Sequence, residues 1–377
     1  MTRTSRAERS RGALAASLLA ATLAFAPADA AGPKPWIVRG LQDVVLLDTD
    51  DGSRVLSRNE GDPAGVGRLR LWVAGELGAG LEGQIVGRIE GGEGTPDGES
   101  ESTIEQALLR WVPPWGARLL VDAGKVAAPF GNFRDRTFSD VNPLIGAPDG
   151  YDVSYPLGLV VTGQASRLDY RVAVLDGPMT NENYVPEAGS AWRPGAALGV
   201  TPMIGFRLGG YATQGPYLGP SVEAQLPAGE HWRDFEQRIL GVELKFSRGH
   251  FELNGDVAFS RYDVPTSEAE SRGQAWFLEP QYAWTPRLFT ALRLERNDYP
   301  FIRPVSSAFW IARNAKFYGL EAGLGWRFSP PLLIKGSYRA DRWDVDPARA
   351  AMFPDGHAVA IELSYRFDVL SWFEPPR

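Results

Sequence analysis

The feature that most constrains this fold is an alternation of apolar and polar residues with a period of two. In residues 359–368, Val, Ile, Leu, Tyr and Phe alternate with Ala, Glu, Ser, Arg and Asp. The same alternation recurs in residues 69–77, 251–259 and 318–328. Successive side chains of a β-strand point to opposite faces, so the pattern predicts a sheet with one apolar and one polar face. Helical patterning is nearly absent after residue 30, so the chain is predicted to be all-β.

About sixteen segments of roughly ten residues follow this pattern. The predicted strands are 36–47, 66–77, 81–90, 103–112, 117–126, 157–165, 168–176, 195–201, 203–213, 237–247, 250–261, 274–284, 287–297, 316–328, 332–341 and 358–369. Short connections, such as Thr201-Pro202 and Arg248-Gly249, alternate strictly with long ones, such as 127–156 and 298–315. Short turns on one rim and long loops on the other are typical of a transmembrane antiparallel β-barrel. An even strand number also places both chain ends on the short-turn rim.

Aromatic residues near strand ends favour lipid as the surroundings of the apolar face. These residues are Trp111, Tyr170, Trp276, Tyr282, Trp284, Trp326 and Phe328. Membrane barrels carry such aromatic girdles at both interfaces. The alternative is a soluble β-sandwich, in which the same aromatic residues would fill a core.

The first thirty residues predict a secretory signal peptide. Four arginines (Arg3, Arg6, Arg9 and Arg11) precede an apolar run over 12–26 and a small-residue cleavage site, Ala28-Asp29-Ala30. The run is shorter than the ~20 residues of a membrane-spanning helix. Cleavage after Ala30 would remove four basic and two acidic residues, leaving residues 31–377 as a single barrel domain with 35 basic and 44 acidic residues and a net charge of −9. The predicted destination is the outer membrane of a Gram-negative bacterium.

Composition excludes several classes of protein. The absence of Cys excludes a disulfide framework and a thiolate metal site. The acidic balance and the lack of a Lys/Arg cluster in the body of the chain argue against nucleic-acid binding. No segment after residue 30 approaches ~18 uncharged apolar residues, so entry into a membrane would require strands. No cofactor or metal site is expected.

A barrel of this size is too wide for its side chains to fill, so the polar parity should line water. The candidate pore-lining residues are Arg68, Arg70, Arg88, Arg110, Arg118, Arg207, Glu252, Asp256, Arg293, Glu295, Arg327, Arg339 and Arg366. Basic and acidic inward candidates are equally numerous, and several, such as Arg293/Glu295 and Arg339/Asp341, lie two apart on one strand. Ion pairs that only brace the wall are the alternative role for these residues.

The third long connection, about 127–156, is the candidate constriction. A structureless loop of this length is uncommon and usually functional. Phe130, Phe133 and Phe138 need a surface to pack on, which favours a loop folded into the lumen over one lying outside. There it would place charges where the low-dielectric wall focuses their field. The candidate constriction residues are Lys125, Arg134, Asp135, Arg136, Asp140, Asp149 and Asp152.

Several segments resemble the phosphate-selective porin (porin O/P) family. They are 124–131 (GKVAAPFG), 155–163 (YPLGLVVTG), 169–178 (DYRVAVLDGP), 238–243 (RILGVE) and 251–256 (FELNGD). The resemblance implies a sixteen-stranded trimeric barrel that admits small anions or other solutes. One departure matters: those channels are rich in Lys and Arg at the constriction, whereas this loop has two Arg and four Asp. Phosphate selectivity therefore does not carry over. The chain end is also atypical of such barrels, because Glu374-Pro375-Pro376-Arg377 follows the aromatic pair Trp372-Phe373.

The sequence thus predicts a porin for passive diffusion of small hydrophilic solutes or ions. An outer-membrane enzyme is one alternative, but His231, His250 and His357 lie in no recognisable nucleophile motif. A structural or adhesin barrel is another, although no loop reaches the size of a domain. The expected partners are solutes, outer-membrane lipid and lipopolysaccharide, to which the acidic segment 91–101 could bind through divalent ions. That segment lacks the spacing of a calcium loop.

Overall fold

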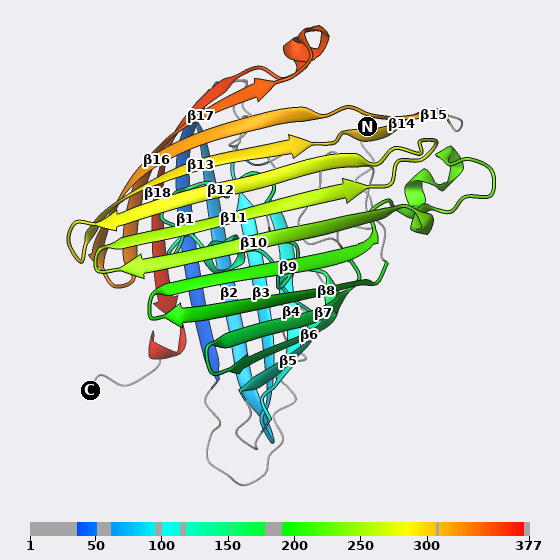
Figure 1. Ribbon diagram of the computed structural model, residues 1–377. Coiled ribbons are helices and arrows are strands. Elements are labelled where there is room, and N and C mark those ends of the chain that lie inside the picture. Colours follow the sequence, from blue (N-terminus) through cyan, green and yellow to red (C-terminus); the bar gives the residue numbers. More distant parts are fainter. Residues whose placement is uncertain are drawn as a thin grey trace, which may run out of the picture.

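Sixteen antiparallel strands close into a single barrel, as the alternation predicts (Figure 1). The computed structural model describes residues 36–50, 62–93, 95, 100–113, 118–151, 153–177, 191–306 and 309–372. The predicted signal peptide lies outside these described residues. The ring closes where β1 pairs with β18, in a register that runs from Arg39 opposite Asp368 to Thr49 opposite Ala358.

Each barrel strand coincides with a predicted segment to within a few residues. The strands are β1 (Ile37–Thr49), β2 (Ala64–Gly78), β3 (Leu81–Gly91), β4 (Glu101–Trp111), β5 (Leu119–Lys125), β6 (Leu157–Ala165), β7 (Leu168–Leu175), β8 (Arg193–Met203), β9 (Phe206–Pro216), β10 (Glu236–Arg248), β11 (Phe251–Tyr262), β12 (Ser271–Ala283), β13 (Leu288–Tyr299), β16 (Ala315–Ser329), β17 (Leu332–Asp344) and β18 (Gly356–Asp368). The alternation of short turns and long loops is also confirmed.

One local prediction is wrong, and one predicted loop carries structure of its own. The turn between β8 and β9 is at Ile204-Gly205 and not at Thr201-Pro202. Gly205 adopts a φ of +82°, a left-handed conformation that a proline ring forbids. The predicted loop 298–315 contains a small hairpin, β14 (Ile302–Ser306) and β15 (Phe309–Ala312), which pairs outside the barrel sheet.

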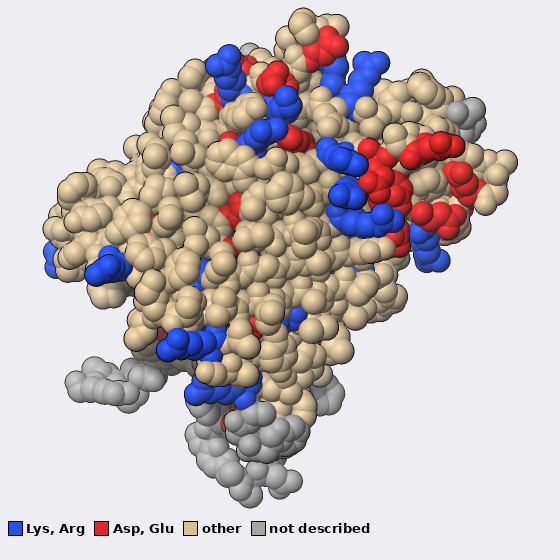
Figure 2. All heavy atoms as spheres, in the orientation of Figure 1, with Lys and Arg blue, Asp and Glu red and all other residues tan. Residues whose placement is uncertain are grey.

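Residue exposure along the strands confirms which face points outward. On β16, Tyr318, Leu320, Leu324, Trp326 and Phe328 are exposed, whereas Glu321 between them is buried. Few charged side chains show across the middle of the face formed by β10–β16 (Figure 2). Six of the seven predicted girdle aromatics lie near short-turn ends of strands, and Trp276 lies in the long-loop half of β12. The soluble sandwich is therefore wrong.

The long loops on one side of the barrel pack into a small apolar core. The β9–β10 connection carries the 3₁₀ helices η2 (Pro220–Gln225) and η3 (Trp232–Asp234). Trp310 of β15 donates from Nε1 to the carbonyl of Gln225 at 2.9 Å and from its backbone N–H to Thr266 at 2.9 Å. Tyr217, Leu218 and Ile302 are buried in the same cluster. Three loops thus form one folded platform on the long-loop rim.

The remaining short elements are three 3₁₀ helices: η1 (Phe133–Arg136), η4 (Pro347–Met352) and η5 (Leu370–Trp372). In the part of the chain that the structure describes, no helix is long and apolar enough to cross a membrane.

A charge placed on the outward face should impair insertion. Leu324 is exposed in the middle half of β16, and we expect Leu324→Arg to cost about 2–4 kcal/mol of folding free energy in lipid. The matched control is Leu370→Arg in η5, beyond the end of β18, which should have little effect. Urea titration of the protein in lipid vesicles would measure both changes, and equal stabilities would contradict the assignment of this face to lipid.

Candidate functional site

The connection between β5 and β6, residues 126–156, is here called the β5–β6 loop. Its two ends run side by side, because Val126 N–H donates to Pro156 O at 2.9 Å and Ala128 N–H donates to Ser154 O at 3.0 Å. At Gly131 the backbone takes a φ of +80°, which lets the chain turn. Beyond this turn, the loop binds inward-facing side chains of the barrel wall at a series of anchors.

The first anchor is the carboxylate of Asp256 on the inner face of β11. It accepts hydrogen bonds from the backbone N–H of Asn132 at 2.8 Å, from Tyr151 Oη at 3.2 Å and from Tyr211 Oη at 2.9 Å. Phe133 and Tyr151 pack edge-on against Phe277. The aromatic residues of the loop thus find their packing surface on the inner wall.

A second anchor is Arg136 at the end of η1. Its guanidinium pairs with Glu279 and, at 2.9 Å, with Glu252. It also donates to Gln281 at 3.3 Å. The three partners lie on β11 and β12, and the side chain of Glu279 is completely buried. An arginine that neutralises a buried carboxylate in this way is a structural bridge between loop and wall.

Lys335 of β17 forms the third anchor. Its buried ammonium donates to the backbone carbonyls of Ser139 at 2.8 Å, Asn142 at 3.0 Å and Leu144 at 2.8 Å. It also pairs with Glu362 of β18 at 2.9 Å. One ammonium has three N–H donors, so the three carbonyls satisfy it and the carboxylate balances its charge. This residue fixes the path of the loop between positions 139 and 144.

Arg293 of β13 extends the network. Its guanidinium pairs with Glu279 at 2.5 Å and Glu321 at 3.1 Å, and donates to the carbonyl of Gly146 at 2.6 Å. Glu321 in turn accepts from the backbone N–H of Ile145 at 3.1 Å. The two-residue spacing suggested that Arg293 would pair with Glu295 on its own strand. In the structure, Arg293 pairs with acids on the two neighbouring strands instead.

The last part of the loop is bound by acids and bases of β13 and β17. Glu295 accepts from the backbone N–H of Asp149 at 2.6 Å and pairs with Arg339 at 2.5 Å. Arg339 also pairs with Asp341 at 2.7 Å, which is the same-strand pair expected from the sequence. Asp149 accepts hydrogen bonds from Asn297 and Tyr299. The charged side chains of this part of the wall therefore bind the loop or one another.

The seven candidate constriction residues therefore occupy different environments. Arg136, Asp140 and Asp149 are bound to wall residues, Asp140 through an ion pair with Arg366. Arg134 and Asp135 keep 26% and 49% of their side chains exposed. Lys125 is half-buried at the end of β5, and Asp152 lies outside the described residues.

The inner wall is open on one side and covered on the other. On β12, β13 and β17, the side chains of Glu279, Arg293 and Arg339 are 0–3% exposed. On β2, β3 and β4, Arg68, Arg88 and Arg110 are 24%, 26% and 31% exposed, whereas Arg70 and Glu105 on the same wall are 5% and 4% exposed. Nearer the short-turn ends, Arg118, Glu252 and Arg366 are accessible, Arg327 is half-buried, and Arg207 is 16% exposed. Solvent therefore reaches the lining mainly along the β2–β4 wall and at the short-turn end.

Arg134 and Asp135, on the exposed part of the loop, lie near the basic residues Arg171 and Lys245 of the wall. Asp135 pairs with Lys245 at 2.5 Å and with Arg134 at 3.2 Å. Burial tends to raise the pKa of Asp135, but Arg134 and Lys245 outweigh it and hold that pKa below its ordinary value. Burial and the nearby Arg171 lower the pKa of Arg134. Asp135 therefore stays ionised at neutral pH.

The sequence analysis did not identify two buried acidic residues of the lining, Glu105 and Asp43. Glu105 is the extra residue of a β-bulge in β4, between Ile104 opposite Gly87 and Gln106 opposite Val86. The bulge turns it inward, where it pairs with Arg70 at 3.0 Å and Arg88 at 3.5 Å. Asp43 of β1 accepts a hydrogen bond from Ser139 of the loop. Its strand continues as Val44-Val45-Leu46-Leu47, which is apolar on both faces and gave no signal of orientation.

The histidines are engaged away from the lumen. His231 caps η3, His250 Nδ1 lies 2.7 Å from the carbonyl of Ala283, and His357 Nδ1 lies 2.7 Å from Tyr338 Oη. Within the described residues, no group of three or more His, Cys, Asp or Glu side chains is arranged to hold a metal ion.

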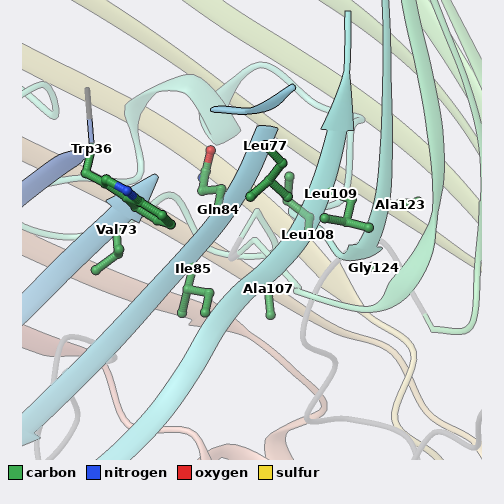
Figure 3. Close-up of a pocket in the computed structure, with 11 residues that line it drawn as sticks. Trp36, Val73, Leu77, Gln84, Ile85, Ala107, Leu108, Leu109, Ala123 and Gly124 are labelled. Carbon is green, nitrogen blue, oxygen red and sulfur yellow. The ribbon is translucent and has the colours of Figure 1, made fainter. Parts of the chain in front are cut away.

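A separate hollow of about 490 Å³ lies on the outer face of β2–β5 (Figure 3). Trp36, Val73, Leu77, Ile85, Leu109 and Ala123 line it. These side chains belong to the outward parity of their strands, so the hollow faces the surroundings of the barrel and not the lumen. It is almost wholly apolar.

Solved structures with the same fold are outer-membrane proteins. The anion-selective porin from Comamonas acidovorans is 12% identical with a TM-score of 0.61, covering 89% of this chain and 100% of its own. Salmonella typhi OmpF, in a complex with daunomycin, is 12% identical with a TM-score of 0.61 and covers 89% and 98%. A trimer form of Vibrio cholerae OmpT is 10% identical with a TM-score of 0.56 and covers 88% and 99%. The fold is thus that of outer-membrane porin barrels.

No protein-family model matches this sequence, and the search of curated proteins found no match.

Removing the Lys335 anchor should destabilise the protein. Lys335→Met leaves three carbonyls and the Glu362 carboxylate without their buried partner, and breaking such a pair costs about 3–5 kcal/mol. Lys316→Met is the matched control, because Lys316 and its partner Asp344 are 45% and 61% exposed. Thermal unfolding together with limited proteolysis would compare the variants. If the two lose equal stability and the β5–β6 loop resists cleavage in both, Lys335 does not anchor the loop.

Proposed function

We propose that the chain is a porin of the bacterial outer membrane, which lets small hydrophilic solutes or ions diffuse through its lumen. The observation that carries the proposal is a closed sixteen-stranded barrel with an apolar outer face, a charged inner face and a long loop bound to that inner face. A barrel of sixteen strands is wide enough for an aqueous channel. Export with cleavage after Ala30 belongs to the same proposal.

The channel would run off the barrel axis, along β2–β4. The β5–β6 loop covers the inner faces of β11–β18, where the wall charges are buried in ion pairs. Arg68, Arg88 and Arg110 remain partly exposed on the opposite wall. Arg134 of the loop is also partly exposed, next to Asp135, which pairs with Lys245 of β10. Solutes would then be selected by the width of this passage and by the field of its charges.

Ion selectivity would be weak and without a phosphate preference. The exposed arginines have acidic neighbours: Glu90 lies 2.5 Å from Arg68, and Asp122 lies 2.8 Å from Arg110. Most of the loop acids are occupied in anchors, so they neither attract cations strongly nor leave a purely basic constriction. The low-affinity passage of mixed solutes fits this balance better than a dedicated binding site for one anion.

An enzyme or an adhesin is supported less well. Each described histidine is engaged by a capping interaction, a backbone carbonyl or a tyrosine. The acid nearest the His231 ring is Glu223, at 3.7 Å in the exposed loop platform, and no nucleophile motif surrounds this pair. The platform of long loops offers an external surface, but it is built from connections of ordinary length and not from an added domain.

The outer hollow between β2 and β5 supports assembly into a homotrimer. β5 has 7 residues, which span roughly 23 Å along the strand and less across the membrane once tilted, whereas the apolar band of a bilayer is about 25 Å tall. A second copy would cover this short, hollowed sector better than lipid. The Vibrio cholerae OmpT barrel with the same fold is described in a trimer form.

Conductance in planar bilayers tests the channel itself. The purified barrel should give stepwise current increments, because each inserted chain adds one aqueous path. Correctly folded barrels that insert and never conduct would overturn the proposal. Heat-denatured protein is the negative control, and it should give no current steps.

The proposed route predicts which arginines set selectivity. Arg88→Ala and Arg134→Ala should each shift the reversal potential in a salt gradient toward cations by roughly twofold in permeability ratio, since one charge in water is worth about 1 kcal/mol or less at 4 Å. Arg136→Ala should shift it in the same direction by freeing Glu252. Arg261→Ala, on the outer face and 59% exposed, is the matched control. An equal shift in the control, or none in Arg88→Ala and Arg134→Ala, would rule out this route.

The oligomer prediction can be tested on the hollow. Ala123→Arg introduces a charge at its outward-facing rim and should dissociate subunits into monomers in mild detergent, as measured by native mass spectrometry. Leu363→Arg, on the outer face of β18, is a control for the general effect of an outward arginine. Retention of the same oligomer by Ala123→Arg would exclude this face as the contact.

A further inference from the structure

The two rims of the outer face differ in chemistry. Near the short-turn rim, outward positions carry aromatic residues: Phe246, Tyr282, Trp326, Phe328, Tyr365 and Phe367. Near the long-loop rim, six neighbouring strands each carry one outward cation: Arg238, Arg261, Arg272, Arg296, Lys316 and Arg342. On the long-loop side of this face, Lys and Arg gather together with Asp and Glu (Figure 2). Long loops of such barrels are extracellular, so the cations face the outer leaflet.

Pairing places four of the outward residues in one row across four strands. Trp276 lies opposite Arg296, Arg296 opposite Tyr318, and Tyr318 opposite Arg342. We call this the Trp276–Arg342 row. The guanidinium of Arg296 lies 5.6 Å from the centre of the Tyr318 ring. Arg296 and Arg342 are separated by two strand spacings, about 10 Å, so both guanidinium groups can reach one ligand.

The next outward row toward the membrane centre is apolar. Leu278 lies opposite Leu294, Leu294 opposite Leu320, and Leu320 opposite Ala340. Ala340 leaves space, and a hollow of about 460 Å³ forms there. Its lining includes Trp276, Tyr318 and Arg342 from the upper row and Leu294, Leu320 and Ala340 from the lower one. The hollow therefore has a cationic, aromatic top and an apolar floor.

The row lies at the margin of the expected apolar band. Tyr318 and Trp326 are eight residues apart on β16, which corresponds to about 26 Å along the strand and roughly 20 Å along the membrane normal at a tilt of ~40°. The band of a bacterial barrel is about 25 Å tall. With Trp326 in the short-turn girdle, Tyr318 and its neighbouring arginines sit at the headgroup level of the opposite leaflet.

The acids around the hollow leave Arg342 available. Asp298 binds Arg296 in a two-bond pair at 2.9 Å, and Asp344 pairs with Lys316 at 3.2 Å. Asp355, which lines the hollow, accepts from the backbone N–H of Trp343 at 2.8 Å. Among the residues that the structure describes, no carboxylate lies within 4 Å of the guanidinium of Arg342. An exposed guanidinium above an apolar hollow matches an anionic headgroup with attached acyl chains.

We propose that the Trp276–Arg342 row binds the phosphate of an outer-leaflet lipid, with an acyl chain of that lipid on Leu294 and Leu320. The inference rests on the proposed insertion in the outer membrane. Arg342 donates to the phosphate, Arg296 neutralises the Asp298 carboxylate beside it, and the two aromatic rings flank the headgroup. This site would hold one lipid molecule on the outer face of β12–β17, away from the hollow of β2–β5.

Native mass spectrometry of the whole protein tests this site with two probes, doubly phosphorylated lipid A and the same lipid with its phosphates removed. The phosphorylated form should be retained about tenfold better, because only its phosphate accepts a charge-assisted hydrogen bond from Arg342. Arg342→Gln should remove about tenfold of this preference. Arg248→Gln is the matched control, since Arg248 is an exposed outward arginine at the short-turn end of β10.

Three results would overturn the proposal: equal retention of both lipids, an unchanged preference in Arg342→Gln, or an equal loss in Arg248→Gln. Inorganic phosphate alone, bound as tightly as the lipid, would assign the site to a free anion and would also overturn it. Arg296→Gln provides a second variant should Arg342→Gln fold poorly. Wild-type conductance is recorded in parallel, so absence of a channel with lipid preference intact would reject only the proposed function.

Discussion

The rest of this structure depends on one constraint: backbone N–H and C=O groups in an apolar surrounding need partners within the protein. The chain meets it by closing its sheet, with β1 paired to β18 over eleven consecutive positions. Closure leaves no strand edge open to lipid. It also fixes which side chains point inward, because the period of two then assigns every second residue of all sixteen strands to the lumen. The charged interior follows directly from that closure.

Charges confined in such an interior must be paired, and the β5–β6 loop takes part in the pairing. Arg293, Lys335 and Arg339 each pair with a wall carboxylate, and loop carbonyls accept the further N–H donors of Arg293 and Lys335. Loop carbonyls and wall carboxylates together satisfy them, so the loop is held by the same interactions that neutralise the wall. This arrangement explains why one half of the lining is buried and the other half remains accessible. The passage proposed along β2–β4 lies on the side of the lumen where more of the wall charges stay accessible.

The outer face is organised in an equally uneven way. Its short-turn rim is aromatic, its long-loop rim is cationic, and the sector around β5 is short and hollowed. Different neighbours suit these regions: headgroups of two unlike leaflets for the rims and another protein surface for the hollow. The chemistry of the outer face thus differs from region to region, according to the neighbour that each region suits.

The sequence alone determined the strands, their inward and outward faces and the order of turns and loops, because strand periodicity and turn residues are local properties. It also identified Arg136, Asp256 and Arg293 as inward-facing charges. The sequence pattern could not reveal Glu105, since a single bulge reverses the parity on which the assignment relies. Nor could it reveal Asp43, because the four residues that follow it, Val44 to Leu47, are apolar on both faces of the strand. The tertiary structure decided which charges meet across the lumen. Lys335 and the carbonyl of Ser139 are 196 positions apart in the chain, and only closure of the barrel brings them within 2.8 Å.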